Sequence, residues 1–194
     1  KDPAGKILYR IISIQDITER KQAEAALEAS ENRFRSLIER SSDGIVVVSE
    51  KGEIIYESPS ATRLIGFEPV ERINRSTFEH IHPDDLQKAQ TAFSHIANHP
   101  GKPIYVEYRA IRKNGDIWWA DVVATNLLKE PSVLGIVINF RDITERKNAE
   151  KNLRESEKRF STIFEDSPVT IAISRLKDGK IILANPAAFN LFGY

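Results

Sequence analysis

The chain has 194 residues, of which 28 are Lys or Arg and 28 are Asp or Glu, so its formal net charge is zero. That balance argues against the basic surface that nucleic-acid binding needs and against a polybasic membrane anchor. The absence of Cys excludes disulfides, thiolate metal sites, Cys nucleophiles and cofactors attached through a thiol. The length predicts one domain, or one domain and a part. No apolar run approaches the roughly 18 residues that span a bilayer.

The chain contains an internal repeat. The segment Asp-Ile-Thr-Glu-Arg-Lys at 16–21 recurs 126 residues later, at 142–147. A second matched block, at an offset of 127, pairs Ile54 and Pro59 with Ile181 and Pro186. Such a period is too long for a solenoid unit of about 20–50 residues. It predicts tandem copies of a whole small domain.

A helical pattern follows each copy of the hexapeptide, and linker helices are expected over 16–33 and 145–166. Apolar and small residues recur at spacings of 4 and 3, the a/d pattern of a coiled coil. These positions are Ala23, Leu27, Ser30, Phe34 and Leu37 in the first copy and Ala149, Leu153, Ser156, Phe160 and Ile163 in the second. Two interpretations stay open: a weak seam that pairs two chains, or a solvated spacer helix held by charge pairs such as Glu31–Arg35.

Between the linkers the pattern predicts two strands, short helices, one longer helix and three strands. The strands are expected at Ile45–Ser49, Ile54–Glu57, Ile104–Arg112, Ile117–Leu127 and Leu134–Arg141. Ser58-Pro59 predicts a short helix that ends at Gly66, and Pro83 begins the longer helix. Asn114-Gly115 is a hairpin signal. This order predicts an α+β domain: an antiparallel five-stranded sheet with helices on one face, flanked by linker helices.

Taken in order, several of these segments resemble the PAS sensory family. The matching segments are Ser42-Asp43-Gly44-Ile45, Tyr56-x-Ser58-Pro59-Ser60, Gly66-Phe67, Ile81-His82-Pro83-Asp84-Asp85, Arg112-Lys113-Asn114-Gly115-Asp116-x-Trp118 and Arg141-Asp142-Ile143-Thr144-Glu145-Arg146. The resemblance implies the PAS fold, with a complete copy over 34–144 that includes its C-terminal extension. It further implies that residues 1–15 are the end of a preceding copy, whose last strand is matched by Ile7–Thr18, and that 167–194 are the incomplete start of a following copy.

The resemblance also implies a function. Members of the family are small-molecule-binding or relay modules that sit in tandem ahead of an output domain, such as a histidine kinase or a diguanylate cyclase. A cytoplasmic homodimer in a two-component system is therefore expected, with the signal carried by the helices after the Asp-Ile-Thr motif. Asp142, Ile143 and Thr144 form the expected signalling joint, in which Asp142 ties the last strand to the linker and Thr144 caps the helix beginning at Glu145. The alternative is that these residues act only as a helix cap.

The expected ligand position is an apolar pocket between sheet and helices. Its expected lining residues are Val47, Ile55, Leu64, Phe78, Phe93, Val106, Tyr108, Val122, Ala124, Asn126 and Ile138. Asn126, Asn139 and Arg109 are the polar residues expected to orient a ligand. The alternative is equally open: the same side chains fill the core, since three of them are large aromatics.

Cofactor chemistry finds weak support in the residues. His80, His82, His95 and His99 lie in one window, and His95 on the longer helix is the heme candidate. His99 is expected to point away from it. Trp118 and Trp119 are adjacent on a strand, so one ring is expected in the core and the other on the outer face. A noncovalent small ligand is thus favoured over heme, flavin or metal.

The sequence shows no arrangement of residues that indicates catalysis. Asp84 and Asp85 are explained by a helix N-terminus and Asp116 by a hairpin, and there is no phosphate loop or nucleophile elbow. The segment is therefore not expected to be an enzyme. Three functions compete: a sensory relay module, a ligand-free dimerisation spacer, and a heme or flavin redox sensor.

Overall fold

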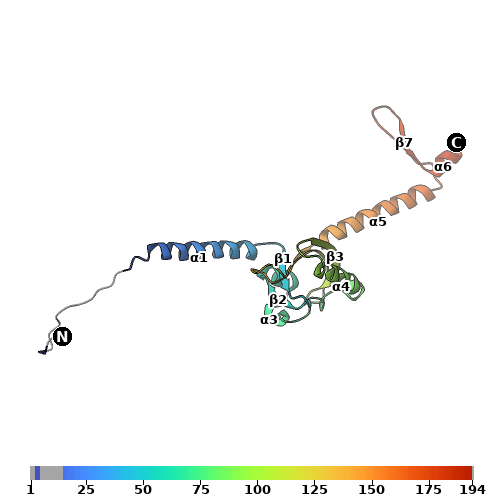
Figure 1. Ribbon diagram of the computed structural model, residues 1–194. Helices are drawn as coiled ribbons and strands as arrows, with labels where there is room; N and C mark the ends of the chain where they lie inside the picture. Colours follow the sequence, from blue (N-terminus) through green and yellow to red (C-terminus); the bar gives the residue numbers. More distant parts are fainter. Residues whose placement is uncertain (1–2, 5–14, 194) are drawn as a thin grey trace.

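The computed structural model describes residues 3–4 and 15–193, and Figure 1 shows how their helices and strands are arranged. The strand expected near the N-terminus lies largely outside the described residues. Between two long helices, a five-stranded antiparallel sheet runs in the order β2-β1-β5-β4-β3. Its strands are β1 (Gly44–Val48), β2 (Ile54–Glu57), β3 (Pro103–Ile111), β4 (Ile117–Leu127) and β5 (Gly135–Asp142).

Three helices cover one face of this sheet: α2 (Pro59–Ile65), α3 (Pro69–Arg72) and α4 (Pro83–Ala97). The core lies between them and the sheet, and α4 packs on β3 and β4. The central members of the core are Val46, Val48, Ile54, Ile65, Trp118, Ile136 and Phe140. The α+β fold, with the sheet and helices predicted from the sequence, is confirmed.

Short-range signals place the helix ends. The Ser58 side chain accepts a hydrogen bond from the amide of Ala61, and Pro59 occupies the first turn of α2, where its missing N–H costs nothing. Gly66 ends α2 with a φ of 81°, a left-handed conformation that favours glycine. Each of these residues acts within a few positions of itself, which is why the sequence predicts both ends of the helix.

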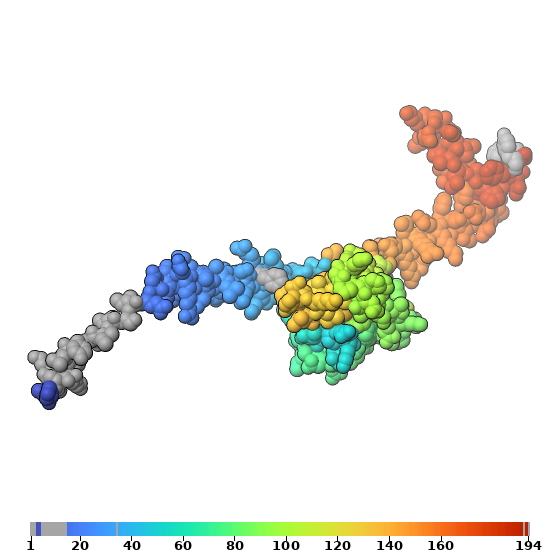
Figure 2. Space-filling model, in the orientation of Figure 1, coloured from blue at the N-terminus to red at the C-terminus, as the bar shows by residue number. Residues whose placement is uncertain are grey.

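Two long helices leave the domain. α1 (Thr18–Glu39) precedes the sheet and α5 (Thr144–Asp166) follows it, and they run away from the domain in opposite directions (Figure 1). Figure 2 shows the domain as the widest part of an elongated molecule. The first linker helix, expected to end at 33, continues to Glu39 and so crosses the boundary placed at Phe34. Several described residues of the 4-3 seam are exposed, namely Leu27, Leu37, Leu153, Phe160 and Ile163.

A second small unit follows α5. It consists of β6 (Ala172–Ser174), which pairs antiparallel with β7 (Ile181–Ala184), and α6 (Pro186–Phe192). Its helix begins as α2 does: the Asn185 side chain accepts from the amide of Ala188, and Gly193 ends the helix with a φ of 76°. These elements repeat β1, β2 and α2, in agreement with the repeat in the sequence.

Candidate functional site

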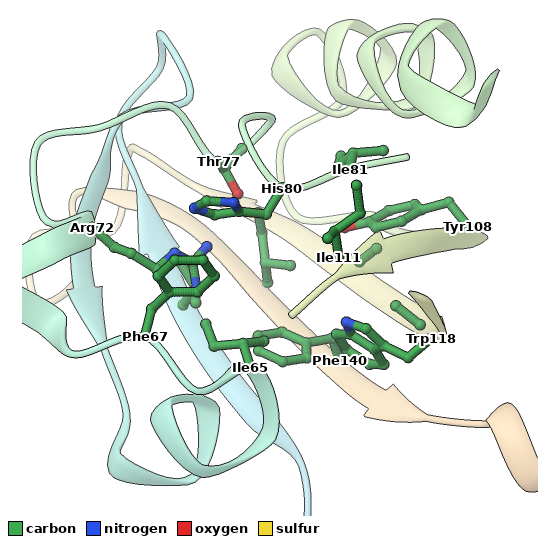
Figure 3. A pocket seen from close by; sticks show the side chains of 14 residues that line it. Ile65, Phe67, Arg72, Thr77, His80, Ile81, Tyr108, Ile111, Trp118 and Phe140 are labelled. Atoms are coloured by element: carbon green, nitrogen blue, oxygen red, sulfur yellow. The ribbon is translucent and has the colours of Figure 1, made fainter. Parts of the chain in front are cut away.

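A cavity of about 50 Å³ lies between the sheet and the segment from α2 to the start of α4. Figure 3 shows side chains from both layers converging on it. Its walls are mostly apolar, and the labelled ones are Ile65, Phe67, Ile81, Tyr108, Ile111, Trp118 and Phe140. Since a water molecule requires about 10–15 Å³ of such space, this volume corresponds to roughly three to five waters. The cavity therefore suits a compact molecule.

Polar groups enter this cavity from α3 and β4. Arg72, 7% exposed, forms an ion pair with Glu57, 6% exposed, with 3.1 Å between Nη1 and Oε2. Burial lowers the pKa of Arg72 and raises that of Glu57, because a low-dielectric interior disfavours both charges. Trp118 is 3% exposed, and its indole Nε1 is buried with no hydrogen-bond partner. The sequence offered no signal for the Glu57–Arg72 pair.

His80 is the histidine at this cavity. Its ring stacks on Phe67, with 4.1 Å between the ring centroids. Burial and the positive charge of Arg72 both lower the pKa of His80, so its ring is neutral at pH 7. The cavity thus presents a paired cation, a neutral imidazole and an indole N–H, and its net charge is close to zero.

A second cavity of about 30 Å³ adjoins the first, under α4. The two share Thr77, Ile81, Tyr108 and Ile138. Burial raises the pKa of Tyr108 to about 12, so its phenol keeps its proton. Of the pocket residues expected from the sequence, this second cavity contains Phe78, Phe93, Val106, Tyr108, Val122, Ala124 and Ile138.

The other expected pocket residues lie elsewhere. Val47, Ile55 and Asn139 line a groove on the opposite face of the sheet, so their expected place in the pocket is corrected. Leu64 packs against the hydrophobic core. Asn126 is buried, but its amide donates to the carbonyls of Ile96 and Ala97 and so satisfies the C-terminal end of α4.

Val47 and Ile55 lie outside the pocket because they are on the face of the sheet opposite the helices. Val46 and Val48 face the helices, while Val47 between them faces the groove, because side chains alternate along a strand. The pairing of β1 with β2 shifts register between Val47 and Val48, so Ile55 is 50% exposed beside the fully buried Ile54. Arg109, expected to orient a ligand, instead pairs with Asp85 at the start of α4, with 2.9 Å between Nη2 and Oδ1.

The joint between β5 and α5 is built around Asp142. Its Oδ1 accepts from the amide of Thr144 at 2.8 Å, and its Oδ2 accepts from the guanidinium of Arg112. Burial alone would raise the pKa of Asp142, but the hydrogen bonds from Thr144 and Arg112 outweigh burial and lower it. Ile143 is buried, and its amide donates to the carbonyl of Trp119. The last strand is therefore tied to the linker by side-chain and backbone bonds together.

Contrary to the expectation from the sequence, Thr144 does not cap the helix but has another role. It is itself the first residue of α5, and its hydroxyl accepts from the amide of Trp119 on β4 at 3.0 Å. The helix start is held instead by Asp142, two residues earlier. Glu107 on β3 adds two ion pairs to the first turn of α5, with Arg146 and Lys147, each at 2.6 Å. Sequence reasoning missed Glu107 because a charged strand residue has no local signal of its partner.

Arg112 connects this joint with the cavity. Its guanidinium lies 4.8 Å from the centre of the Trp118 ring, donates to the carbonyl of Leu64 and pairs with Asp142. The Trp118 ring is the one in the core, and Trp119 lies between Arg109 and Lys147 on the other face, as strand alternation predicts. One side chain thus touches the cavity wall, α2 and the linker joint.

The remaining histidines lie on and beside α4. His95, the heme candidate, is exposed, and its ring stacks on His99 with 4.0 Å between centroids. The expectation that His99 points away from His95 is therefore wrong: four residues apart, both rings lie on the same side of the helix end. His82 accepts through Nδ1 from the amide of Asp84. Across residues 3–4 and 15–193, no three His, Asp or Glu side chains cluster as metal ligands would.

This architecture, a sheet with one face covered by helices over a small cavity and tied by hydrogen bonds to an outgoing helix, is typical of a sensory relay domain. A family model described as the PAS fold matches residues 32–143, and a second, described as a PAS domain, matches 158–194. The chain belongs to the PAS family. It is a sensory signal-relay module.

Known proteins agree with this assignment. The chain is 27% identical to the sensor histidine kinase TmoS of Ectopseudomonas mendocina, over 70% of this chain and 14% of TmoS. It is 30% identical to the two-component sensor PprA of Pseudomonas aeruginosa, over 80% of this chain and 17% of PprA. The crystal structure of the PAS domain of an HTR-like protein from Haloarcula marismortui superposes with a TM-score of 0.55 at 25% identity, over 63% of this chain and 99% of that one.

These relatives are much longer than the chain, which spans less than a fifth of the length of either protein. They are multi-domain proteins, and the region they share with this chain is a small part of each. In the part of the chain that the structure describes, neither long helix carries an apolar stretch of the length needed to cross a bilayer.

Proposed function

We propose that the domain binds a compact ligand in the cavity between sheet and helices and relays its occupancy through Arg112 and Asp142 to α5. The parent protein in this proposal is a sensor histidine kinase, as in the relatives. The observation that carries the proposal is the position of Arg112, in contact with the Trp118 ring at the cavity and paired with Asp142 at the joint. A ligand that moves the indole therefore moves the partner of Asp142.

The energy that such a relay needs is small. A coupling free energy of about 1–3 kcal/mol is enough for allosteric regulation. The contacts at the joint are of this size: a hydrogen bond to a charged group contributes about 1.5–3 kcal/mol. Shifting the Arg112–Asp142 contact between two geometries is therefore sufficient, and the sheet itself need not change.

The test uses the ¹⁵N-labelled chain and a panel of uncharged molecules of about five to seven non-hydrogen atoms. Binding is expected to shift amide resonances around Trp118 and also those in the first two turns of α5, at 144–150. Arg112→Gln should keep the first set and lose the second. Lys113→Gln is the matched control, since the neighbouring Lys113 pairs with the surface residue Glu71. If the α5 resonances shift equally in both variants, the relay through Arg112 is wrong.

A ligand-free spacer is the competing function, and the small volume of the cavity favours it. Mass spectrometry of the gently purified chain, before and after denaturation, separates the two. A small molecule released on denaturation supports the sensor. Failure of the panel to bind, together with no released molecule, supports the spacer. Neither heme nor flavin enters the proposal, because His95 is exposed and the cavity of about 50 Å³ is far smaller than either group.

The proposal includes a parallel homodimer through the linker helices, in the cytoplasm. Its support is the exposed 4-3 seam: Leu153, Phe160 and Ile163 are 62%, 53% and 69% exposed on α5. Burying such side chains against a second copy is favourable at about 25 cal/mol per Å². Light scattering should report a dimer that Leu153→Glu dissociates, whereas Leu176→Glu, at an exposed position outside the seam, should leave it intact. A monomer at high concentration contradicts the dimer. The cytoplasmic location stays a prediction.

A further inference from the structure

Two buried N–H groups at the cavity have no acceptor. They are Nε of Arg72 and Nε1 of Trp118, on side chains that are both more than nine-tenths buried. Both residues line the same cavity. Most buried donors in folded proteins are satisfied, and an unpaired one is unfavourable enough to require an explanation. Figure 3 shows Arg72 and Trp118 reaching the group of lining side chains from opposite sides.

The charges around these donors are already balanced. Glu57 neutralises Arg72, and the lowered pKa of His80 leaves its ring uncharged at pH 7. The phenol of Tyr108 keeps its proton as well. An anionic ligand would therefore add an uncompensated negative charge to a buried site, which is strongly unfavourable. Among the residues that line the cavity, the buried side-chain atoms without a hydrogen-bond partner are these two donors. The two carboxylate oxygens of Glu57 also lack a hydrogen bond, but Glu57 lies outside the lining, so the cavity itself offers donors and accommodates no further charge.

The rest of the wall is apolar. Ile65, Ile138 and Phe140 border the cavity, and their contribution to binding is the removal of hydrocarbon surface from water. Water alone would satisfy the donors poorly, since a buried water makes about three hydrogen bonds and the apolar wall offers few further partners. A molecule with an oxygen acceptor and an apolar body matches both parts of the wall.

We propose that the ligand is a compact, uncharged molecule carrying a carbonyl-type oxygen, which accepts a hydrogen bond from Trp118 or Arg72. This inference rests on the proposed ligand-binding function and names the class of ligand. Its body has about five or six non-hydrogen atoms, in keeping with the room for roughly three to five waters.

The experiment compares three probes of similar size by NMR titration: cyclopentanone, cyclopentane and butanoate. Cyclopentanone is expected to bind most tightly and to move the indole N–H proton of Trp118 downfield. Trp119→Phe assigns that resonance and should bind as the unaltered chain does. Trp118→Phe keeps an aromatic ring but removes the donor, and it should weaken cyclopentanone binding by roughly three- to tenfold more than it weakens cyclopentane binding.

Each other outcome overturns the inference in a recognisable way. Equal binding of cyclopentane and cyclopentanone, with no movement of the indole proton, would show that the ligand needs no oxygen acceptor. The proposed ligand-binding function would still be supported. Butanoate binding as tightly as the ketone removes the requirement for an uncharged ligand. If no probe binds and the indole proton exchanges magnetisation with a bound water, water satisfies the donor, and the sensory cavity itself is then contradicted. Because the indole resonance is read in the unaltered chain, the test survives a Trp118→Phe variant that fails to fold.

Discussion

The Asp-Ile-Thr sequence occurs at the start of α1 and again at the start of α5, and the two described copies share their local hydrogen bonds but differ in their long-range contacts. In both, the Asp carboxylate accepts from the amide of the Thr two residues later, at 2.9 Å for Asp16 and 2.8 Å for Asp142. Ile17 is 46% exposed, whereas Ile143 is 7% exposed. Asp142 also pairs with Arg112, and that partner comes from the β3–β4 hairpin. The tripeptide by itself forms the local hydrogen bond at the helix start. The contacts that tie this helix to the domain come from residues of the sheet and its hairpin.

The matched segments β2–α2 and β7–α6 likewise share local hydrogen bonds but differ in burial. Ser58 and Asn185 accept from the third residue after them, and both helices end at a glycine with positive φ. Yet Ile54 is 1% exposed in the complete copy, and its counterpart Ile181 is 62% exposed. Hydrogen bonds over three or four residues form in both places. Burial needs β3, β4 and β5, which supply the rest of the core in the complete copy.

The largest expected effect comes from the Ile54 and Ile181 pair. Ile54→Ala should lower the free energy of unfolding by about 2–5 kcal/mol, because it removes a fully buried side chain. Ile181→Ala should change it by no more than about 0.5 kcal/mol. Denaturant unfolding followed by circular dichroism measures both. An equal loss in the two variants would mean that the second unit packs against another copy.

Asp142 and Asp16 give the next comparison. Asp142→Ala removes the helix-start hydrogen bond and leaves Arg112 without its carboxylate, at a cost of about 2–3 kcal/mol. The sheet should stay folded while amides at 144–150 exchange faster with deuterium. Asp16→Ala should speed exchange only in the first turn of α1, at 18–21. Equal and purely local effects would show that Asp142 is a helix cap and nothing more.

The start of α4 belongs to the complete copy and has no counterpart among the described residues of the second unit. Asp85 tests its contribution to stability. Hydrogen bonds from Arg109 lower the pKa of Asp85 to about 2. The carboxylate therefore stabilises the fold above about pH 4, and this stabilisation is lost as the pH falls from 4 to 2. With solvent screening its size is about 1 kcal/mol. Asp85→Asn should flatten the pH dependence of unfolding in this range.

The smallest effect is expected at Thr144. Thr144→Val keeps the shape of the side chain but leaves the Trp119 amide without its acceptor, which should cost about 0.5–1 kcal/mol. Thr18→Val, at the start of α1, should leave the free energy of unfolding unchanged. Deuterium exchange at the Trp119 amide gives the direct measurement. If this amide stays as protected as before, the hydroxyl of Thr144 contributes nothing to the joint.

Most of the fold could be predicted from the sequence because its signals are local. Ser58-Pro59, Gly66, His82-Pro83 and Asn114-Gly115 mark ends and turns, and β2 and β4 have the expected bounds. The orientation of β1 could not be predicted. Its residues Ile45–Val48 are all apolar, so alternation does not say which set faces the helices. The irregular pairing with β2 then reversed the side expected for Ile55.

The candidate site was less predictable than the fold. Seven expected lining residues do converge under α4, and two of them, Val122 and Ala124, lie on β4, whose buried and half-buried residues alternate. The groups that give the cavity its chemistry were missed: Arg72 and Glu57 are charged residues that pair across 15 positions, inside the core. No local pattern predicts a buried ion pair, since each partner read alone indicates a surface position. Only the folded chain brings them together beside Trp118.

In the proposed relay, the hydrogen-bonded start of α5 would make this helix a lever. With 23 residues at about 1.5 Å each, it is about 35 Å long, so each degree of tilt at the joint would displace its far end by about 0.6 Å. A change at the cavity too small to disturb the packing of the sheet would thereby be magnified at the next unit along the chain. The gain depends on the length of the helix, and a deletion of whole turns from α5 would shorten the stroke in proportion.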